Sequence, residues 1–236
     1  MGTQMVFKRY EIKYRMNLRQ QAAVLQAMEP YMKADEYGLS SIRNLYYDTP
    51  DYRLIRASLE KPVYKEKLRL RGYGRRGERD EVFLELKKKY RDVVYKRRIV
   101  LPYGAAIQAL AGERPLPDSQ IGREISYALD YYHPLRPAVF LSYDRIAYYD
   151  CGGSDFRVTF DRNIRYRREE VTLNSENWGA MLLEEDEVLM ELKTSGAIPL
   201  WMVRALSAQG LNKTSFSKYG AAYQEMLQQK KGAACL

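Results

Sequence analysis

The stretch Lys65–Gly72, KEKLRLRG, decides the fold of this chain. Its residues alternate between basic positions and positions that are mostly apolar, and alternation with period two is typical of a β-strand. In a strand, successive side chains point to opposite faces of the sheet, so one face of this strand is cationic. Four like charges on one face repel one another unless something anionic lies against them. The basic positions are Lys65, Lys67, Arg69 and Arg71.

The same alternation recurs in six further predicted strands, within residues 6–15, 82–90, 93–100, 140–147, 155–163 and 187–195. One face of each is mainly apolar, and the other face carries most of the charge. On this second face the cations clearly outnumber the carboxylates. Its residues are Arg9, Glu11, Lys13, Arg15, Phe83, Glu85, Lys87, Lys89, Val94, Lys96, Arg98, Val100, Leu141, Tyr143, Arg145, Ala147, Asp155, Arg157, Thr159, Asp161, Asn163, Leu189, Glu191, Lys193 and Ser195.

The order of the predicted elements indicates an α+β fold. Strands are interrupted by helices rather than alternating regularly with them, which favours an antiparallel sheet with helices packed around it. Asn17 is placed to cap the first helix. No linker or repeat divides the chain, so we expect a single domain over residues 1–236. The predicted helices span residues 18–33, 51–61, 199–209 and 215–231, with two more pieces within 104–135.

Two interpretations of the cationic face are open. Antiparallel sheets often expose one polar face to water, and for any single strand this is the simpler explanation. Solvated faces normally mix the two signs of charge, however, and this one does not. If the sheet curls into a barrel with helices outside, the cations line a tunnel. We therefore expect an antiparallel β-barrel with a cationic lumen, surrounded by helices.

The composition limits the possible functions. The chain has 236 residues, a formal net charge of +9 and a pI of about 9.3, which indicates an anionic partner such as polyphosphate, nucleic acid or a membrane surface. Its one histidine excludes multi-histidine metal sites, and its two cysteines are far apart, so we expect no disulfide partner. No apolar run is long enough to span a bilayer. These features predict a soluble cytoplasmic protein.

The chemistry of phosphate fits this pattern of residues. Arginine and lysine side chains that converge from several strands match the oxygens of a phosphate chain. The carboxylates of Glu11, Glu85, Asp161 and Glu191 offer oxygen ligands, which favour Mg²⁺ or Mn²⁺. Transfer of a phosphoryl group onto another phosphate needs no histidine, because the attacking oxygen is already deprotonated.

The chain resembles the catalytic tunnel domain of the vacuolar transporter chaperone (VTC) polyphosphate polymerases. That domain belongs to the CYTH-like triphosphate tunnel metalloenzymes. Each motif that carries the resemblance is weak alone, but together they occur in the family's order over nearly the whole chain. The motifs are FKRYEIKY, NLYYDTP, KLRLRGYG, VFLELKKK, VVYKRRI, LSYDR, FRVTFDRNI, LMELK and NKTSFSKYG.

The resemblance implies transfer of the γ-phosphate of ATP onto inorganic polyphosphate, with Mn²⁺ or Mg²⁺ as cofactor. It makes Glu191 of MELK the metal ligand, places Tyr143 in the matching SYDR motif, and assigns Ser217 and Lys218 to one tunnel mouth. To these the alternation adds Lys67, Lys89, Arg98 and Lys193 as substrate-binding residues, and Glu85 and Glu11 as further metal ligands. The residues that match the family's phosphate-coordinating cations are Lys13, Arg69, Arg71, Lys87, Lys96, Arg145 and Arg157.

The chain departs from the family pattern in two ways, and two alternatives to the polymerase function stay open. Fungal members of the family carry an SPX domain and transmembrane helices that this chain lacks, so a separate membrane protein could be a partner. Related tunnel enzymes hydrolyse triphosphates, and a water-orienting pair such as Glu11 with Glu85 would favour that activity. The second alternative is a non-catalytic module that binds polyphosphate or RNA, because the 21 tyrosines could stack bases. The family pattern makes nucleic acid the least expected partner.

Overall fold

The computed structural model describes residues 10–91 and 93–233. Its strands join in one sheet in the order β11-β1-β10-β8-β7-β3-β4-β5-β6, in which every neighbouring pair is antiparallel, and β2 and β9 pair with β7 and β8. The strands are β1 (Tyr10–Asn17), β2 (Met32–Ala34), β3 (Ser40–Asp48), β4 (Tyr64–Tyr73), β5 (Glu81–Tyr90), β6 (Val93–Pro102), β7 (Arg136–Asp150), β8 (Arg157–Arg167), β9 (Ala180–Met181), β10 (Glu187–Thr194) and β11 (Lys213–Thr214).

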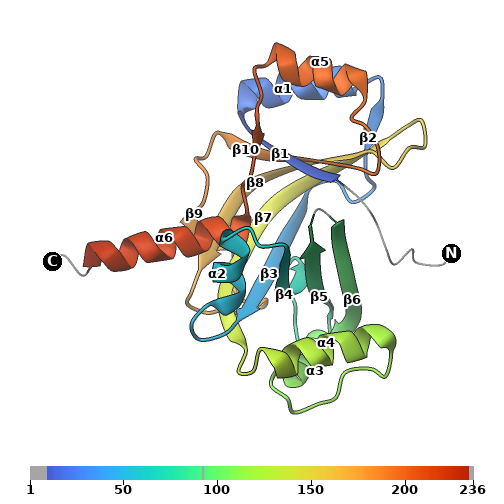
Figure 1. The fold of residues 1–236 in the computed structure, drawn as a ribbon. Coiled ribbons are helices and arrows are strands. Elements are labelled where there is room, and N and C mark those ends of the chain that lie inside the picture. Colours follow the sequence, from blue (N-terminus) through green and yellow to red (C-terminus); the bar gives the residue numbers. More distant parts are fainter. Residues whose placement is uncertain (1–9, 92, 234–236) are drawn as a thin grey trace.

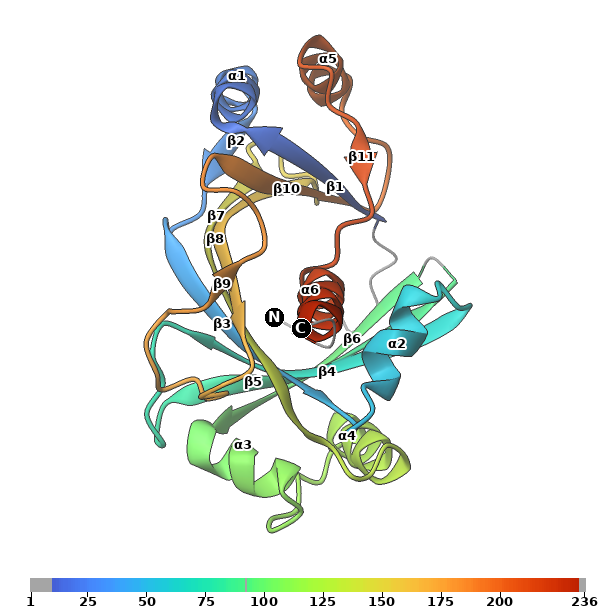
Figure 2. The same cartoon turned by 90° about the vertical axis from the view of Figure 1, so that its left-hand side faces the viewer.

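The sheet curls around a central space. Seen along that space, β10 and β1 form one side, β7, β8 and β3 the next, and β4, β5 and β6 a third (Figure 2). This confirms the predicted antiparallel tunnel fold with flanking helices. The expected barrel is not strictly closed, because in the described part of the chain β11 and β6 end the strand order without pairing with each other.

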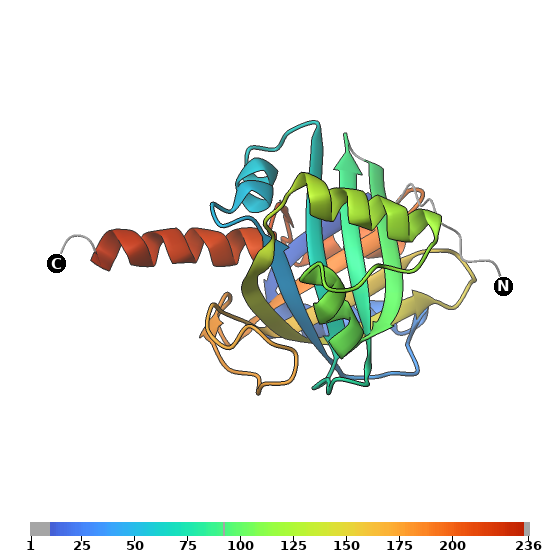
Figure 3. The ribbon, with the colours of Figure 1, turned by 90° about the horizontal axis from the view of Figure 1, so that it is seen from below.

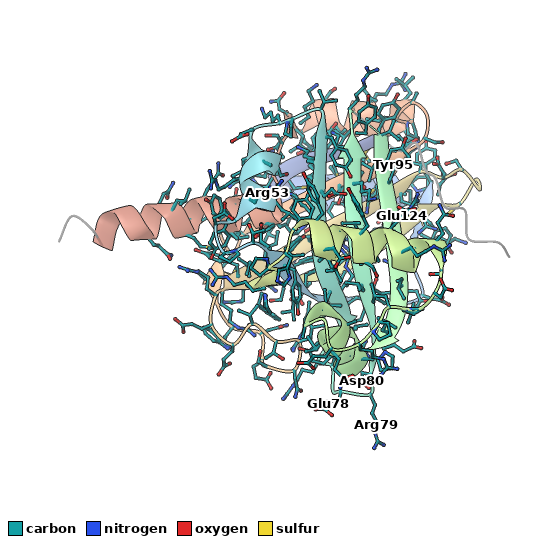
Figure 4. All side chains as sticks on the ribbon, turned by 60° about the horizontal axis from the view of Figure 1, so that its bottom comes forward. Arg53, Glu78, Arg79, Asp80, Tyr95 and Glu124 are labelled. Atoms are coloured by element: carbon teal, nitrogen blue, oxygen red, sulfur yellow. The ribbon has the colours of Figure 1, made fainter. Side chains whose placement is uncertain are left out.

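Helices cover two sides of the curled sheet from outside. Helices α1 and α5 lie together beyond β1 and β10, while α3 and α4 lie beneath β4, β5 and β6 (Figures 1 and 3). On this second side, Glu124 of α4 accepts a hydrogen bond from Arg97 Nε of β6 at 2.8 Å (Figure 4). The helices are α1 (Leu18–Met28), α2 (Arg53–Leu59), α3 (Tyr103–Leu110), α4 (Gln120–Tyr131), α5 (Leu200–Ala208) and α6 (Lys218–Ala233).

The apolar faces of the strands build two outer cores. In one, Leu68, Leu70, Leu84 and Leu86 of β4 and β5 are almost fully buried beneath α3 and α4. In the other, strands β1, β8 and β10 pack against α1 and α5. A fully buried leucine side chain stabilises the folded state by about 1.5–3 kcal/mol. The apolar half of the alternation therefore supports the sheet from outside, and the cationic half is turned inward.

The last helix does not follow the expectation that all helices lie outside. The first turns of α6 lie inside the curl of the sheet, and the rest projects away from the body (Figures 1 and 2). Tyr219 and Tyr223 of α6 pack on Leu141 and Leu189, which belong to the same face as the cations. The inner face is therefore divided between an apolar end that holds α6 and a cationic end.

Some predicted boundaries shift for local reasons. The helix predicted over residues 18–33 ends at Met28, because Pro30 cannot continue it. Its start is confirmed, since the Asn17 side chain and Gln20 form a capping box. The first residues of the strand predicted from residue 6, and also Cys235, lie outside the described residues. Cys151 is an exposed free thiol.

Among the helices of the described residues, not one is both long enough and apolar enough to cross a bilayer.

Asp48 joins α2 to α6. Its fully buried carboxylate accepts hydrogen bonds from the backbone N–H groups of Leu54 and Ile55 in the first turn of α2. The hydroxyl of Tyr219 donates to the same carboxylate at 2.8 Å. Burial raises the pKa of Asp48, and these donors act in the opposite direction. The contact holds the base of α6 in place.

We expect Tyr219→Phe to lower the free energy of unfolding by about 1–3 kcal/mol, because a buried carboxylate loses one of its donors. Urea unfolding followed by circular dichroism measures this loss. Tyr223→Phe is the matched control, since its hydroxyl has no hydrogen bond among the described residues, and we expect a smaller effect. Equal stability losses in the two variants would contradict the role given to the Tyr219 hydroxyl.

Candidate functional site: a cationic lumen

The inner face gathers many more cations than carboxylates. Strand register places them in adjacent rows: Lys13 pairs with Glu191 between β1 and β10, and Lys67 pairs with Lys87 between β4 and β5. We call the basic group the lumen cations. They are Lys13, Lys67, Arg69, Arg71, Lys87, Lys96, Arg98, Arg145, Lys193 and Lys218, and the lumen carboxylates are Glu11, Glu85, Asp161 and Glu191.

Glu85 of β5 is the most crowded of these carboxylates. It is 1% exposed, and Oε2 accepts from Arg69 Nε at 2.8 Å, while Oε1 accepts from Arg98 Nε at 2.7 Å. Lys96 Nζ lies 2.6 Å from Oε1, and Arg71 Nε lies 3.7 Å from Oε2. Burial alone would raise the pKa of Glu85, but these four cations hold it far below its usual range. One carboxylate thus orients four lumen cations.

Asp161 of β8 plays a similar part at the base of α6. The guanidinium of Arg145 binds both of its oxygens, at 2.6 and 2.7 Å, and Lys218 Nζ donates to Oδ2 at 2.5 Å. Burial would raise the pKa of Asp161, but Lys218 and Arg145 lower it to about 2. The carboxylate therefore fixes a strand residue and a helix residue side by side.

Glu191 of β10 is held more loosely. Lys193 Nζ lies 3.8 Å and Arg145 Nη2 lies 4.0 Å from its Oε2, and both distances are too long for hydrogen bonds. Burial raises its pKa, but Lys193, Lys13 and Arg145 outweigh burial and hold the pKa well below its usual range. Glu191 is therefore an ionised carboxylate whose oxygens stay open to a further ligand.

The segment that leads into α6 contacts the lumen lysines directly. Lys13 Nζ donates to the carbonyl oxygen of Phe216 at 2.8 Å, and Lys67 Nζ donates to Ser217 Oγ at 2.9 Å. Together with the pair between Lys218 and Asp161, these contacts bring Ser217 and Lys218 to the strand cations. The carbonyl and hydroxyl oxygens occupy positions that a phosphate oxygen could also take.

Tyr143 lies among the same cations. The charged groups of Arg145 and Lys218 lie 5.1 and 4.4 Å from its ring centroid. Burial would raise the pKa of its hydroxyl, but Arg145, Arg71 and Lys218 lower it to about 8. The positive field of the lumen is therefore strong enough to ionise a phenol partly near neutral pH.

Arg157 and Lys89, two of the predicted site residues, lie farther out, near the ends of β8 and β5. Glu11 lies near the gap in the sheet between β11 and β6. Arg157 is exposed and pairs in register with Lys193, farther from α6 than Asp161. Lys89 is half-buried and pairs in register with Lys65 of β4. Glu11 of β1 forms an ion pair with Lys87 of β5 at 2.8 Å, which bridges two strands that are not neighbours in the sheet.

The structure adds two residues that were not predicted as site residues: Tyr46 Oη accepts from Arg69 Nη1 at 3.0 Å, and Asn44 Oδ1 accepts from Arg71 Nε at 3.1 Å. Asp161 was predicted as an oxygen ligand for a metal, but its oxygens accept from Arg145 and Lys218 instead. Asn44 and Tyr46 lie in the motif NLYYDTP, and their alternation within β3 could have placed them on the inner face. The alternation could not show that Asn44 and Tyr46 bind Arg71 and Arg69, because these arginines come from another strand, β4.

The lumen lysines reveal an excess of positive charge. Burial, with the neighbouring Lys13 and Lys87, lowers the pKa of Lys67 to about 7, and burial lowers that of Lys96 to about 7 although Glu85 opposes it. The pKa values of Lys13 and Lys193 are also lowered, again chiefly by burial. A bound anion raises the pKa of such a lysine and restores its charged ammonium form. These lysines therefore favour the binding of an anion.

The predicted metal ligands Glu191, Glu85 and Glu11 differ in how far their carboxylates are already engaged by cations. In residues 10–91 and 93–233, no three carboxylate, imidazole or thiol groups are close enough to enclose a metal ion. A divalent ion bound through phosphates needs only one or two protein carboxylates. Glu191 fits this role, because its oxygens are open. Glu85 fits poorly, since its two oxygens already face four cations, and Glu11 is engaged with Lys87.

Two solved structures share this architecture. A candidate adenylate cyclase from Bacillus halodurans is 14% identical, with 89% of this chain and 96% of that chain covered, at a TM-score of 0.54. A candidate adenylyl cyclase from Hippeastrum, described as having a dominant triphosphatase activity, is 16% identical, with 93% and 96% covered, at a TM-score of 0.52. The fold is therefore that of the CYTH-like triphosphate tunnel proteins.

Within this class the family is defined more narrowly. Residues 8–227 match the family described as the VTC domain, so the chain belongs to the VTC domain family. No curated protein matches the chain. The family and the tunnel fold together support a polyphosphate-related function.

We expect metal-free binding of tripolyphosphate to weaken as pH rises above about 7, the pKa of Lys67. Below this pH the Lys67 ammonium is already charged in the free protein. Above it the Lys67 side chain is mostly neutral, so it must take up a proton when bound phosphate raises its pKa. Calorimetry at pH 8 in two buffers of different ionisation enthalpy measures this proton uptake.

Lys67→Arg keeps a permanent charge at the same position, so it removes part of the proton uptake. Protonation of the ligand itself cancels in the comparison of the two proteins. Two results together would show that Lys67 does not bind the phosphate chain. The wild-type affinity would be equal at pH 6.5 and 8.5, and the wild type and Lys67→Arg would take up the same number of protons on binding.

Proposed function

We propose that this protein is an ATP-dependent polyphosphate polymerase, which transfers the γ-phosphoryl group of ATP onto the end of an inorganic polyphosphate chain. The observation that carries the proposal is the lumen itself, in which ten cations face four carboxylates inside the sheet of a VTC domain. Buried cations in such excess require an anion of high charge density, and a phosphate chain supplies it.

The reaction forms one P–O bond and breaks another. A terminal oxygen of polyphosphate attacks the γ-phosphorus of ATP, the bond from the γ-phosphorus to the bridging oxygen breaks, and ADP leaves with that electron pair. The attacking oxygen is already deprotonated, so no general base is required. The contribution of the protein is to hold both phosphate chains in line and to neutralise their charge.

The lumen residues divide this task by their contacts. Glu85 holds the guanidinium groups of Arg69 and Arg98 in fixed directions, and Asp161 does the same for Arg145 and Lys218. Side chains that are oriented in advance lose little freedom when phosphate binds. The remaining predicted phosphate ligands are Lys13, Lys67, Arg71, Lys87, Lys89, Lys96, Tyr143, Arg157, Lys193 and Ser217.

A divalent ion, Mg²⁺ or Mn²⁺, is part of the proposal. When bound, it neutralises charge on the phosphates. Glu191 is the residue proposed to hold it, because its pKa is held well below the usual range and its nearest cations in the described part of the chain lie 3.8 and 4.0 Å away. We place the activity in the cytoplasm, with ATP and polyphosphate as partners.

Hydrolysis of triphosphates is the second candidate, and the Hippeastrum structure is the observation that favours it. Hydrolysis needs a group that orients water, for which Glu11 with Glu85 was the predicted pair. Both oxygens of Glu85 are occupied by cations, and Glu11 contacts Lys87. This arrangement supports transfer between phosphates over attack by water.

The direct test is turnover of ATP by the purified protein with Mn²⁺ and a pyrophosphate primer. We expect polyphosphate on a resolving gel and an equal amount of ADP, since each transfer adds one phosphate. Free phosphate without polymer would instead identify a triphosphatase. Tight binding of polyphosphate with no turnover would identify a binding module.

We expect Arg145→Ala to reduce the turnover number by at least about 100-fold, because it removes a bidentate guanidinium from the phosphate path. The fold should persist, since Lys218 still pairs with Asp161. Turnover and thermal unfolding are measured on the same preparation. Arg123→Ala is the control, because its side chain is exposed and pairs only with the exposed Asp118. Unchanged turnover in Arg145→Ala would remove this residue from the site.

A further inference from the structure

A buried hydroxyl group on the inner face has no hydrogen-bond partner within residues 10–91 and 93–233. Thr159 of β8 is 6% exposed, and its Oγ1 is fully buried without a hydrogen bond to any described residue. Such a group is destabilising, because the hydroxyl loses its bonds to water and gains none in return. A valine would fill the same volume without this cost. A hydroxyl at this position therefore indicates a ligand.

The strand register places Thr159 beside the open carboxylate. It pairs with Glu191 on β10 and with Ala147 on β7. Its sequence neighbours Val158 and Phe160 point into the outer core, so the Thr159 side chain is on the inner face. Side chains directly opposite on neighbouring antiparallel strands lie about 4.5–5.5 Å apart at Cβ, close enough to share one ligand. Ala147 fills little of the space on the other side.

We propose that Thr159 is a positioning residue for the divalent cation, and that its hydroxyl and the carboxylate of Glu191 together hold a hydrated Mg²⁺ or Mn²⁺ beside the phosphate chain. The inference rests on the proposed binding of metal and phosphate in the lumen. It adds a neutral oxygen donor from a second strand to the single carboxylate, and so gives the ion a defined place on the wall of the tunnel.

A metal cation at this position has two anionic partners. It lies between the carboxylate of Glu191, which is opposite Thr159 in the strand register, and the phosphate chain, and both attract it. A threonine or serine hydroxyl next to a carboxylate is an established oxygen ligand pair for Mg²⁺ in nucleotide sites. Lys193 and Arg145 lie 3.8 and 4.0 Å from Glu191 Oε2, and Lys13 is opposite Glu191 in the strand register, so these cations can take the phosphate oxygens that complete the complex.

Binding of Mn²⁺ in the presence of tripolyphosphate tests the inference without turnover. The free Mn²⁺ signal in electron paramagnetic resonance gives the dissociation constant of the metal, and calorimetry in EDTA gives that of metal-free tripolyphosphate. The variants are Thr159→Val, which keeps the shape and removes the hydroxyl, and Thr159→Ser, which keeps the hydroxyl. Glu191→Gln is the positive control. Thr194→Val is the matched control, because Thr194 is equally buried but bonds to the Gly196 backbone.

We expect Thr159→Val to weaken Mn²⁺ binding about five- to tenfold, the effect of one hydrogen bond or ligand, and to leave metal-free tripolyphosphate binding unchanged. Thr159→Ser should bind Mn²⁺ nearly as the wild type does. Without ligand, Thr159→Val should melt at the same or a higher temperature, since an unpaired hydroxyl has been removed.

Two results would overturn the inference. Equal losses of Mn²⁺ and of metal-free tripolyphosphate binding in Thr159→Val would assign the hydroxyl to phosphate, and unchanged Mn²⁺ binding would leave it without a role toward the metal. In both cases the wild type still binds tripolyphosphate, so the proposed function stands. If the wild type itself bound no tripolyphosphate, the proposed function would fail together with this inference.

Discussion

The excess of positive charge inside a curved sheet is the constraint on which the rest of this structure depends. Ten lumen cations share four carboxylates, and burial lowers the pKa of lysines such as Lys67 and Lys96 to about 7. The fold is stabilised elsewhere, in the outer cores beneath α3 and α4 and beneath α1 and α5. Because the stabilising face is separate from the charged face, the protein can keep an excess of positive charge in its lumen, and under the proposed function a bound polyphosphate chain compensates this charge.

The C-terminal helix uses the apolar part of the same inner face. Leu141 and Leu189 hold α6 inside one end of the curl, and Tyr219 is fixed by the buried carboxylate of Asp48. The first residue of the helix, Lys218, then reaches Asp161. The helix is thus both a structural support for the sheet and the source of a lumen cation, so the position of the helix and the charge of the site depend on each other.

The fold by itself does not choose between polymerase and triphosphatase, since the same cations serve both reactions. The difference is which oxygen attacks the γ-phosphorus. A phosphate acceptor brings its own charge and needs more cations, whereas water needs an available base. The oxygens of Glu85 face four cations, so under the proposed function Glu85 neutralises charge and does not transfer a proton. This division of roles among the carboxylates favours a phosphate acceptor.

The sequence by itself determined the antiparallel sheet, the helices between its strands, the cationic face and the family, because period-two alternation and ordered motifs are local signals. Only the tertiary structure decided that the curl is not strictly closed, that α6 begins inside it, and that Thr159 lies unpartnered opposite Glu191. Alternation tells which face a side chain occupies, but not the curvature of the sheet or the register of distant strands. Contacts such as Lys67 with Ser217, 150 positions apart, depend on both.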